Sequence, residues 1–222
     1  MYLGKIRTLV AVVIFIFIAF SASTWANAES QALVQIKVDL WSNELFVIQN
    51  DLVIRRYPIS SGTEDNPTPI GIFKVTGKSS SWGGGFGTRW LGLNVPWGQY
   101  GIHGTNKPQL IGKNVSSGCI RMRNEDVEDL FNLIPEGTIV HIYGPVTGRG
   151  KGEFKNLSLG SKGNLVLLVQ ERLKGLGLYY GRINGIYDEE TEKAVKRFQK
   201  MNQLPITGGV MIREYILLGL LE

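Results

Sequence analysis

One cysteine and one histidine lie close together in this sequence, and both residue types can take part in nucleophilic catalysis. Cys119 is the only cysteine of the 222 residues, and His103, sixteen positions earlier, is one of two histidines. A thiol reacts as its thiolate, which is a minor form of an ordinary cysteine near neutral pH. A nearby imidazole can take the thiol proton and later return it to a leaving group. We therefore predict that Cys119 is a nucleophile and that His103 is its proton acceptor and donor.

The residues that flank Cys119 are suited to acyl transfer. Gly118 carries no side chain, so the backbone N–H groups of Gly118 and Cys119 can point at one spot. Such donors stabilise the oxyanion of an acyl-transfer intermediate by about 3 kcal/mol each. If the segment is extended, Arg121 shares a face with Cys119, and its guanidinium is suited to a substrate carboxylate.

Other interpretations of these residue types compete with catalysis. Cys119 can instead be a small buried hydrophobic residue, the commonest state of a free cysteine, and composition alone favours neither interpretation. His141 lies in an alternating run at 138–143 and is expected to be structural or on the surface. One cysteine and two histidines form no recognisable zinc-ligand cluster, so no metal is expected.

Length, glycine content and charge restrict the class of protein. A chain of 222 residues has room for one large domain, or for one medium and one small domain. Its 28 glycines predict many turns and short strands. The net charge is +5, and without residues 1–28 the balance of 22 basic and 19 acidic residues is +3. The basic residues are scattered, so we expect no nucleic-acid partner and at most a mild attraction to an anionic surface.

Residues 1–28 have the pattern of a secretory signal peptide. Lys5 and Arg7 give a positive start, the run 9–20 is apolar, and Ala26-Asn27-Ala28 supplies the small-x-small pattern of a cleavage site. The alternative is an uncleaved membrane anchor, because the apolar run with its flanks approaches the length that spans a bilayer. Both interpretations place the rest of the chain outside the cytoplasmic membrane, in the cell wall or secreted, with a membrane contact only through such an anchor.

The part of the chain around the cysteine is predicted to be mainly β. Asn50-Asp51 is a tight-turn dipeptide between two runs that form a hairpin. The segment 124–133 has apolar residues at helical spacing and ends before Pro135. This pattern predicts a β-sandwich or open barrel with one or two helices, and with strands at 34–40, 44–49, 52–59, 70–76, 90–95 and 139–143.

A glycine-rich loop at 79–87 carries two large aromatic residues, Trp82 and Phe86. Exposed aromatic side chains on a flexible loop often contact a ligand, so this loop can be a lid over the site. Equally, both rings can fold back onto the core.

The C-terminal part is predicted to be a small all-α domain. Residues 144–163 are rich in Gly, Lys, Ser and Asn and lack a periodic pattern, which is typical of a linker. Helical spacing of apolar residues follows at 165–176, 189–201 and 212–221, with Asp188 as an expected N-cap. We therefore expect domains at 32–144 and 164–222, joined by a linker at 145–163.

The motif His103-Gly104-Thr105, followed by Ser116-x-Gly118-Cys119-Ile120-Arg121, resembles the signature of the YkuD-type L,D-transpeptidases. The upstream Thr68-Pro69-x-Gly71-x-Phe73 matches that family's pattern, and the similarity covers residues 33–143. One departure is Ser117, where many members carry a second histidine and others do not.

Residues 164–221 are similar to the small helical peptidoglycan-binding module. The similarity rests on Gly185-x-Tyr187-Asp188, Thr191, Ala194-Val195 and Phe198-Gln199.

The resemblance implies a β-rich catalytic domain that acts on peptidoglycan stem peptides and glycan strands without a cofactor. Cys119 would attack the carbonyl of the third, L-centred stem residue and displace the terminal D-alanine. His103 would act as base and then as acid, held by the carbonyl of Gly104. The acyl-enzyme would pass to the side-chain amine of a neighbouring stem, which links two third residues. Arg121 and Ser116 would orient substrate or support the pocket, and carbapenems would inactivate the enzyme.

Two alternative functions stay open. Water can take the acyl group instead of an amine, which gives an L,D-carboxypeptidase, and the sequence does not separate the two. A non-catalytic wall-binding protein is the other alternative, although the presence of both His103 and Cys119 argues against it. A cytosolic cysteine hydrolase is opposed by the signal-like residues 1–28.

Overall fold

The computed structural model describes residues 34–80, 83–147 and 154–221. The predicted signal peptide, residue Trp82 and residues 148–153 of the predicted linker lie outside these ranges. Within the described ranges, no helix has the length and apolar character needed to cross a membrane.

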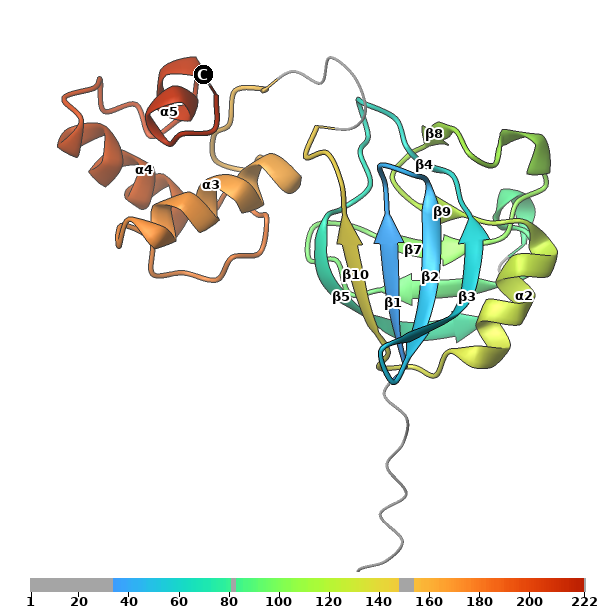
Figure 1. Ribbon diagram of the computed structural model, residues 1–222. Coiled ribbons are helices and arrows are strands. Elements are labelled where there is room, and N and C mark those ends of the chain that lie inside the picture. The colour runs from blue at the N-terminus through green and yellow to red at the C-terminus, as the bar shows by residue number, and fades with distance from the viewer. Residues whose placement is uncertain (1–33, 81–82, 148–153, 222) are drawn as a thin grey trace, which may run out of the picture. The chain divides into compact units, whose positions relative to one another are not determined.

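An eight-stranded sheet forms the scaffold of the part that contains Cys119 (Figure 1). Its strand order is β3-β2-β1-β10-β5-β6-β7-β9, and a separate two-stranded sheet pairs β4 with β8. The strands are β1 Val34–Asp39, β2 Glu44–Gln49, β3 Leu52–Pro58, β4 Ser61–Gly62, β5 Gly71–Ser79, β6 Trp90–Leu93, β7 Tyr100–His103, β8 Asn114–Ser116, β9 Ile120–Arg121 and β10 Ile139–Tyr143.

The β2–β3 hairpin has the turn that its sequence predicts. Asn50 and Asp51 have φ values of 51° and 63°. Two successive left-handed residues are the requirement of a type I′ turn, whose twist matches that of the paired strands. The turn thereby sets the pairing of β2 with β3, although a bulge between Val47 and Ile48 shifts the register within the pair.

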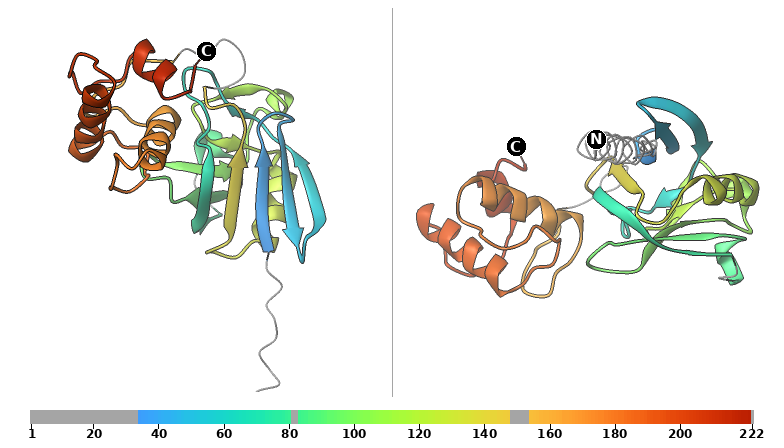
Figure 2. Two further views of the ribbon diagram at one scale, coloured as in Figure 1. Left: turned by 60° about the vertical axis from the view of Figure 1, so that its left-hand side comes forward. Right: turned by 90° about the horizontal axis from the view of Figure 1, so that it is seen from below.

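The core lies between the sheet and helix α2, Asn124–Leu133. Alternation in β1 points Ile36 and Val38 into this core, where neither side chain is exposed to solvent. Val127 and Leu130 of α2 are buried in the same cluster. Figure 2 shows the sheet strongly curved, with α2 at its open side. The predicted mainly β fold with one helix is thus confirmed, and α2 has the predicted bounds.

The C-terminal part has three helices and its own apolar core, as predicted. They are α3 Asn164–Gly175, α4 Glu189–Met201 and α5 Ile212–Leu217. Asp188 caps α4 by accepting a hydrogen bond from the backbone of Thr191 at 2.9 Å. Helix α5 is shorter than the predicted 212–221, because Gly219 has a φ of 65° and ends the helical path.

Gln170, a residue of α3 with no exposed surface, holds the turn that precedes α4. Its Oε1 accepts hydrogen bonds from the backbone N–H groups of Asn184 and Gly185 at 3.0 and 2.9 Å. Its Nε2 donates to the carbonyl of Ile186 and to Thr191 Oγ1, both at 2.9 Å. One side-chain amide therefore satisfies four groups of the turn and the helix start.

Gln199 of α4, which is equally buried, does the same for the turn before α5. Its Oε1 accepts from the N–H of Gly208 at 2.9 Å, and its Nε2 donates to the Gly209 carbonyl and to Glu214 Oε1 at 3.0 Å. Thr191 and Glu214 each occupy the third position of their helix. In the helical part, a buried glutamine therefore hydrogen-bonds the turn before the next helix in two places. The sequence patterns predict neither of these arrangements.

Candidate active site

The pairing of β7 with β9 brings the predicted histidine and cysteine segments together. The two strands are parallel, with Ile102 opposite Ile120 and His103 opposite Arg121. The N–H of Met122 donates to the His103 carbonyl at 2.8 Å and extends the contact past the end of β9. Cys119 immediately precedes β9, so the register of this strand pair places its segment beside that of His103.

His103 is held by the carbonyl of Gly104, the predicted acceptor. The Nδ1 to oxygen distance is 2.6 Å, and only 3% of the residue is exposed. Because a carbonyl oxygen can only accept, Nδ1 carries a proton. In the neutral ring, Nε2 is then the nitrogen that can accept a proton from a thiol.

Two aromatic rings pack against the His103 imidazole. Trp90 stacks on it with a centroid distance of 5.6 Å and an interplanar angle of 23°. Phe86, in the 3₁₀ turn Gly84–Phe86, contacts its edge at 4.9 Å and 65°. The glycine-rich loop therefore reaches the site through Phe86, which stays 37% exposed. Both rings fix the orientation of the imidazole and keep water from it.

Burial lowers the pKa of His103 from 6.5 to about 4. The nearby Arg121 guanidinium lowers the same pKa further, whereas backbone hydrogen bonds to Gly104 and Phe86 oppose the shift. At neutral pH the imidazole is therefore uncharged and available as a base.

Burial also raises the pKa of the Cys119 thiol above its ordinary value, although a backbone hydrogen bond with Gly101 and the charge of Arg121 oppose the rise. The free protein thus holds a neutral thiol with a neutral imidazole, not a preformed ion pair. Proton transfer to His103 would then accompany attack on the substrate.

Ser116 closes the turn that presents Cys119. Its hydroxyl donates to the Cys119 carbonyl at 2.6 Å and accepts from the N–H of Gly118 at 3.0 Å. This second bond corrects the predicted oxyanion site, because the Gly118 N–H is directed at Ser116 and not at a substrate. Of the predicted pair of donors, the N–H of Cys119 is the one left to serve an oxyanion.

Gly118 has a different role from the one predicted. Its φ is +109°, and a Cβ at this position would lie 2.6 Å from Cε1 of Tyr100. Both the conformation and the close approach require glycine. The space that a side chain at position 118 would take is therefore occupied by the Tyr100 ring.

Backbone hydrogen bonds hold Arg121 in place, and its side chain lies near His103 and Cys119. Its N–H donates to the Ser60 carbonyl at 2.9 Å, and the Ser60 N–H donates back at 2.8 Å. Its Nε is buried and finds no hydrogen-bond acceptor among the described residues. A buried cationic donor without an acceptor is suited to an anionic substrate group.

Asn124, at the start of α2, packs against Gly104, the residue whose carbonyl holds His103. Its Oδ1 accepts from the Thr88 N–H at 3.3 Å. The same oxygen occupies the space that a Cβ of Gly104 or of Gly87 would take. The sequence marks Asn124 only as a helix start, so this contact has no sequence signal.

His141 lies in β10, opposite Lys37 of β1 and Ile72 of β5. Its neighbours Val140 and Ile142 point into the core, so His141 faces away from it. This position agrees with the structural or surface role expected from the sequence.

The β7–β9 pairing of a mainly β domain thus places the segment of Cys119 beside that of the buried His103. Comparison with known families identifies its type. Residues 34–142 match the profile of YkuD, described as the L,D-transpeptidase catalytic domain, and residues 162–210 match the profile described as "Putative peptidoglycan binding domain". The chain therefore carries a YkuD L,D-transpeptidase catalytic domain followed by a domain of the peptidoglycan-binding family.

Individual relatives are similar over the catalytic domain. "Putative L,D-transpeptidase YkuD" of Bacillus licheniformis is 44% identical over 108 residues, which are 49% of this chain and 64% of that protein. The Bacillus subtilis protein of the same description is 44% identical over 107 residues, or 48% and 64%. The chain thus spans slightly less than two thirds of these relatives.

Among solved structures, "L,D-transpeptidase from Mycobacterium smegmatis" is 22% identical with a TM-score of 0.44. The match covers 51% of this chain and 59% of that one.

Proposed function

We propose that this chain is an L,D-transpeptidase that joins the third residues of two peptidoglycan stem peptides through a thioester on Cys119. The observation that carries the proposal is the β7–β9 pairing, which sets a buried, neutral His103 beside the segment of Cys119. The YkuD catalytic domain supports the reaction class, and the peptidoglycan-binding domain supports the substrate.

In the first half-reaction, Cys119 Sγ attacks the carbonyl carbon of the third, L-centred stem residue while Nε2 of His103 takes the thiol proton. The negative charge moves to the carbonyl oxygen, where the Cys119 N–H can donate to it. Collapse of this intermediate breaks the C–N bond to the terminal D-alanine. His103 returns its proton to the departing amine, which leaves a thioester on Cys119 and a neutral imidazole.

In the second half-reaction, the side-chain amine of another stem attacks the thioester carbon. His103 accepts a proton from that amine, the C–S bond breaks, and the sulfur regains the proton. An amide between two stems is formed and the free thiol is restored. No cofactor takes part in either half. Arg121, with its buried Nε, would hold a stem carboxylate during both halves.

Incubation of the purified protein with tetrapeptide stems, followed by mass spectrometry, tests the proposal. A cross-linked dimer together with free D-alanine is the expected product. A tripeptide without dimer would indicate the L,D-carboxypeptidase instead, in which water attacks the thioester. Absence of turnover would leave the non-catalytic wall-binding function. A Cys119→Ala variant that cross-links as well as the parent would overturn the mechanism.

Carbapenems provide an independent probe of the nucleophile, because their ring carbonyl can acylate a thiol. We expect the intact protein to gain the mass of one carbapenem and the Cys119→Ala variant to gain none. Addition to both proteins alike would contradict a unique nucleophile.

We also propose that the chain acts outside the cytoplasmic membrane, in the cell wall. The support is the signal-like pattern of residues 1–28 together with a domain of the peptidoglycan-binding family. Fractionation of expressing cells, with N-terminal sequencing of the wall-associated protein, tests this: a start just after Ala28 indicates cleavage, and an intact start indicates an anchor. Recovery from the cytoplasm alone would contradict both.

A further inference from the structure

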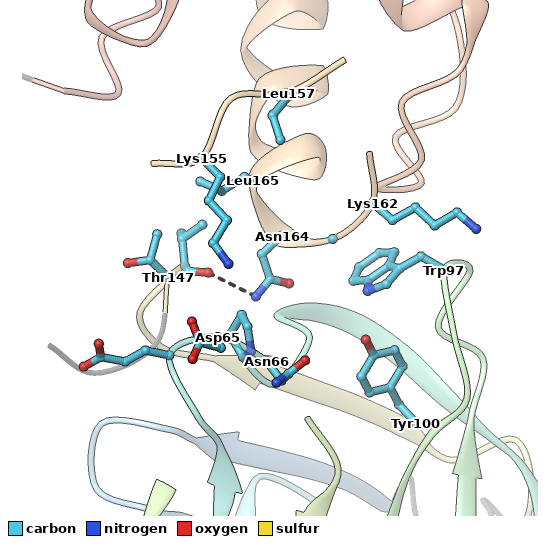
Figure 3. Close-up of a pocket in the computed structure, with 14 residues that line it drawn as sticks. Asp65, Asn66, Trp97, Tyr100, Thr147, Lys155, Leu157, Lys162, Asn164 and Leu165 are labelled. Atoms are coloured by element: carbon cyan, nitrogen blue, oxygen red, sulfur yellow. Dashed lines mark hydrogen bonds between the residues drawn. The ribbon is translucent and has the colours of Figure 1, made fainter. Parts of the chain in front are cut away.

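A cleft of about 500 Å³ lies between Asn66 and Tyr100 on one side and Asn164 on the other (Figure 3). Asn66, Trp97 and Tyr100 line it from the catalytic domain, together with the acidic Glu64 and Asp65. Asn164 and two lysines, Lys155 and Lys162, line it from the C-terminal segment. Aromatic, amide and charged side chains thus converge on one space, as is typical of ligand sites.

The cleft is continuous with the nucleophile's turn through Tyr100. The ring of this residue occupies the space beside Gly118, 2.6 Å from where a Cβ would be. The carbonyl of Pro67, another residue of the cleft lining, lies 3.5 Å from the same point. Tyr100 and Pro67 therefore form a wall that the cleft shares with the turn before Cys119.

Hydrogen bonds hold the C-terminal wall of the cleft. Asn164, only 5% exposed, accepts from the Ile70 N–H at 3.0 Å through its Oδ1. Its Nδ2 donates to the carbonyls of Thr68 and Val146 at 3.1 and 3.2 Å. Asn164 thus uses its side-chain oxygen and nitrogen to bind the segment that leads into β5, and this wall is a built part of the site.

Lys155 supplies a positive charge to this wall. Its side chain is exposed, and Figure 3 shows it extending toward Asn164 and Thr147. None of the ion pairs among the described residues involves Lys155. An ammonium in this position is available to a carboxylate of the ligand.

We propose that this cleft binds the stem peptide of the substrate and that Lys155 binds one of its side carboxylates. This inference rests on the proposed function and deepens it, because it makes the C-terminal segment part of substrate recognition as well as a means of attachment to the wall. The ligand class is a short peptide with free carboxylates along its length.

Binding to the full-length Cys119→Ala protein, measured by isothermal titration calorimetry, tests the proposal without turnover. Two probes are used, a tetrapeptide stem with free side carboxylates and the same stem with these carboxylates converted to amides. Lys155→Gln should weaken binding of the free stem about tenfold, the loss typical of one charge-assisted hydrogen bond. Lys174→Gln is the matched control, since Lys174 is another exposed lysine of the C-terminal segment and lies outside the cleft.

The amidated stem separates a charge contact from a change in shape. It should bind the protein that retains Lys155 about tenfold more weakly than the free stem does, and Lys155→Gln should cause no further loss. Equal binding of the free stem with and without the Lys155→Gln substitution would overturn the proposal, as would an equal loss for both stems. Failure of the proposed function gives a different result from failure of the cleft proposal. In that case mass spectrometry of the unsubstituted protein detects no thioester on Cys119.

Discussion

Trp90 stacks on His103, with ring centroids 5.6 Å apart and planes 23° from parallel. The two residues face each other in the β6–β7 pairing, so the contact follows directly from the strand register. An indole over one face of the imidazole excludes water and thereby disfavours the charged form of the ring. The contact thus joins the fold of the sheet to the protonation state of the proposed base.

Replacing Trp90 by phenylalanine should alter the pH dependence of thioester formation. In the parent, His103 stays neutral down to a pH near its pKa of about 4. Acylation should therefore not fall as the pH passes through 6.5, the ordinary value for histidine. Trp90→Phe should admit water, raise the pKa of His103, move the acidic fall in rate upward, and lower the rate by about tenfold through poorer positioning. Acylation by a carbapenem, followed by stopped-flow absorbance, measures both effects. A rate and profile equal to those of the parent would show that the stack has no positioning role.

The stability of the protein should fall as the pH decreases from about 6.5 to about 4. The unfolded chain binds a proton at His103 in this window, whereas the folded protein with its lowered pKa does not. Protonation therefore favours unfolding, by up to about 3 kcal/mol if the whole shift is expressed. Urea unfolding of the parent and of His103→Gln at a series of pH values measures the effect. The variant should lose this part of the pH dependence, and an unchanged slope would contradict the lowered pKa.

Gly118→Ala should destabilise the protein and abolish thioester formation. A φ of +109° costs a non-glycine residue about 1–3 kcal/mol, and the new Cβ would also meet Tyr100. Gly77→Ala is the control, because that position has no neighbouring atom within 4 Å and no left-handed φ. The free energy of unfolding measures the first effect and mass spectrometry the second. A second substitution, Tyr100→Ala, should recover the steric part of the loss and leave the backbone part. Full activity of Gly118→Ala would show that the turn can rearrange.

Gln170→Ala and Gln199→Ala should each destabilise the helical part by about 2–4 kcal/mol. Gln170→Ala leaves the N–H groups of Asn184 and Gly185 without this acceptor, at about 1–3 kcal/mol per group. Gln199→Ala leaves the N–H of Gly208 without its acceptor and removes the donor to the Gly209 carbonyl and to Glu214. Far-UV circular dichroism during urea unfolding reports the loss. Gln99→Ala, at an exposed position, should have little effect. A large loss for one glutamine and none for the other would show that the two turns are not equivalent.

Local signals explain the parts of the fold that the sequence predicts. The Asn50-Asp51 dipeptide fixes one turn, and the apolar spacing before Pro135 gives the bounds of α2. Asp188 caps α4 as its position suggests. In each case the determining residues lie within a few positions of the structure that they determine.

The rest of the site depends on contacts between distant residues. Strand β9 has only two residues and depends on its pairing with β7, which is itself a four-residue strand paired with β6. The bond from Gly118 to Ser116 likewise has no periodic or compositional signal. The glycine-rich loop marks Phe86 as a residue that contacts either a ligand or the core, but not His103 as its neighbour. The pattern therefore identifies Cys119, His103 and their family resemblance but not the arrangement that makes the histidine a neutral base.

The parallel pairing of β7 with β9 has a consequence for protein engineering and for divergence among related chains. Strand register, and not the path of the intervening chain, sets the relation of His103 to the cysteine segment. The connection between them contains the 3₁₀ turn Pro108–Leu110 and an exposed Lys107. Insertions at that turn can therefore lengthen the chain between the two residues and leave their spacing in space unchanged. Residues that change the substrate specificity can therefore be inserted in this connection while His103 and Cys119 keep their relative positions.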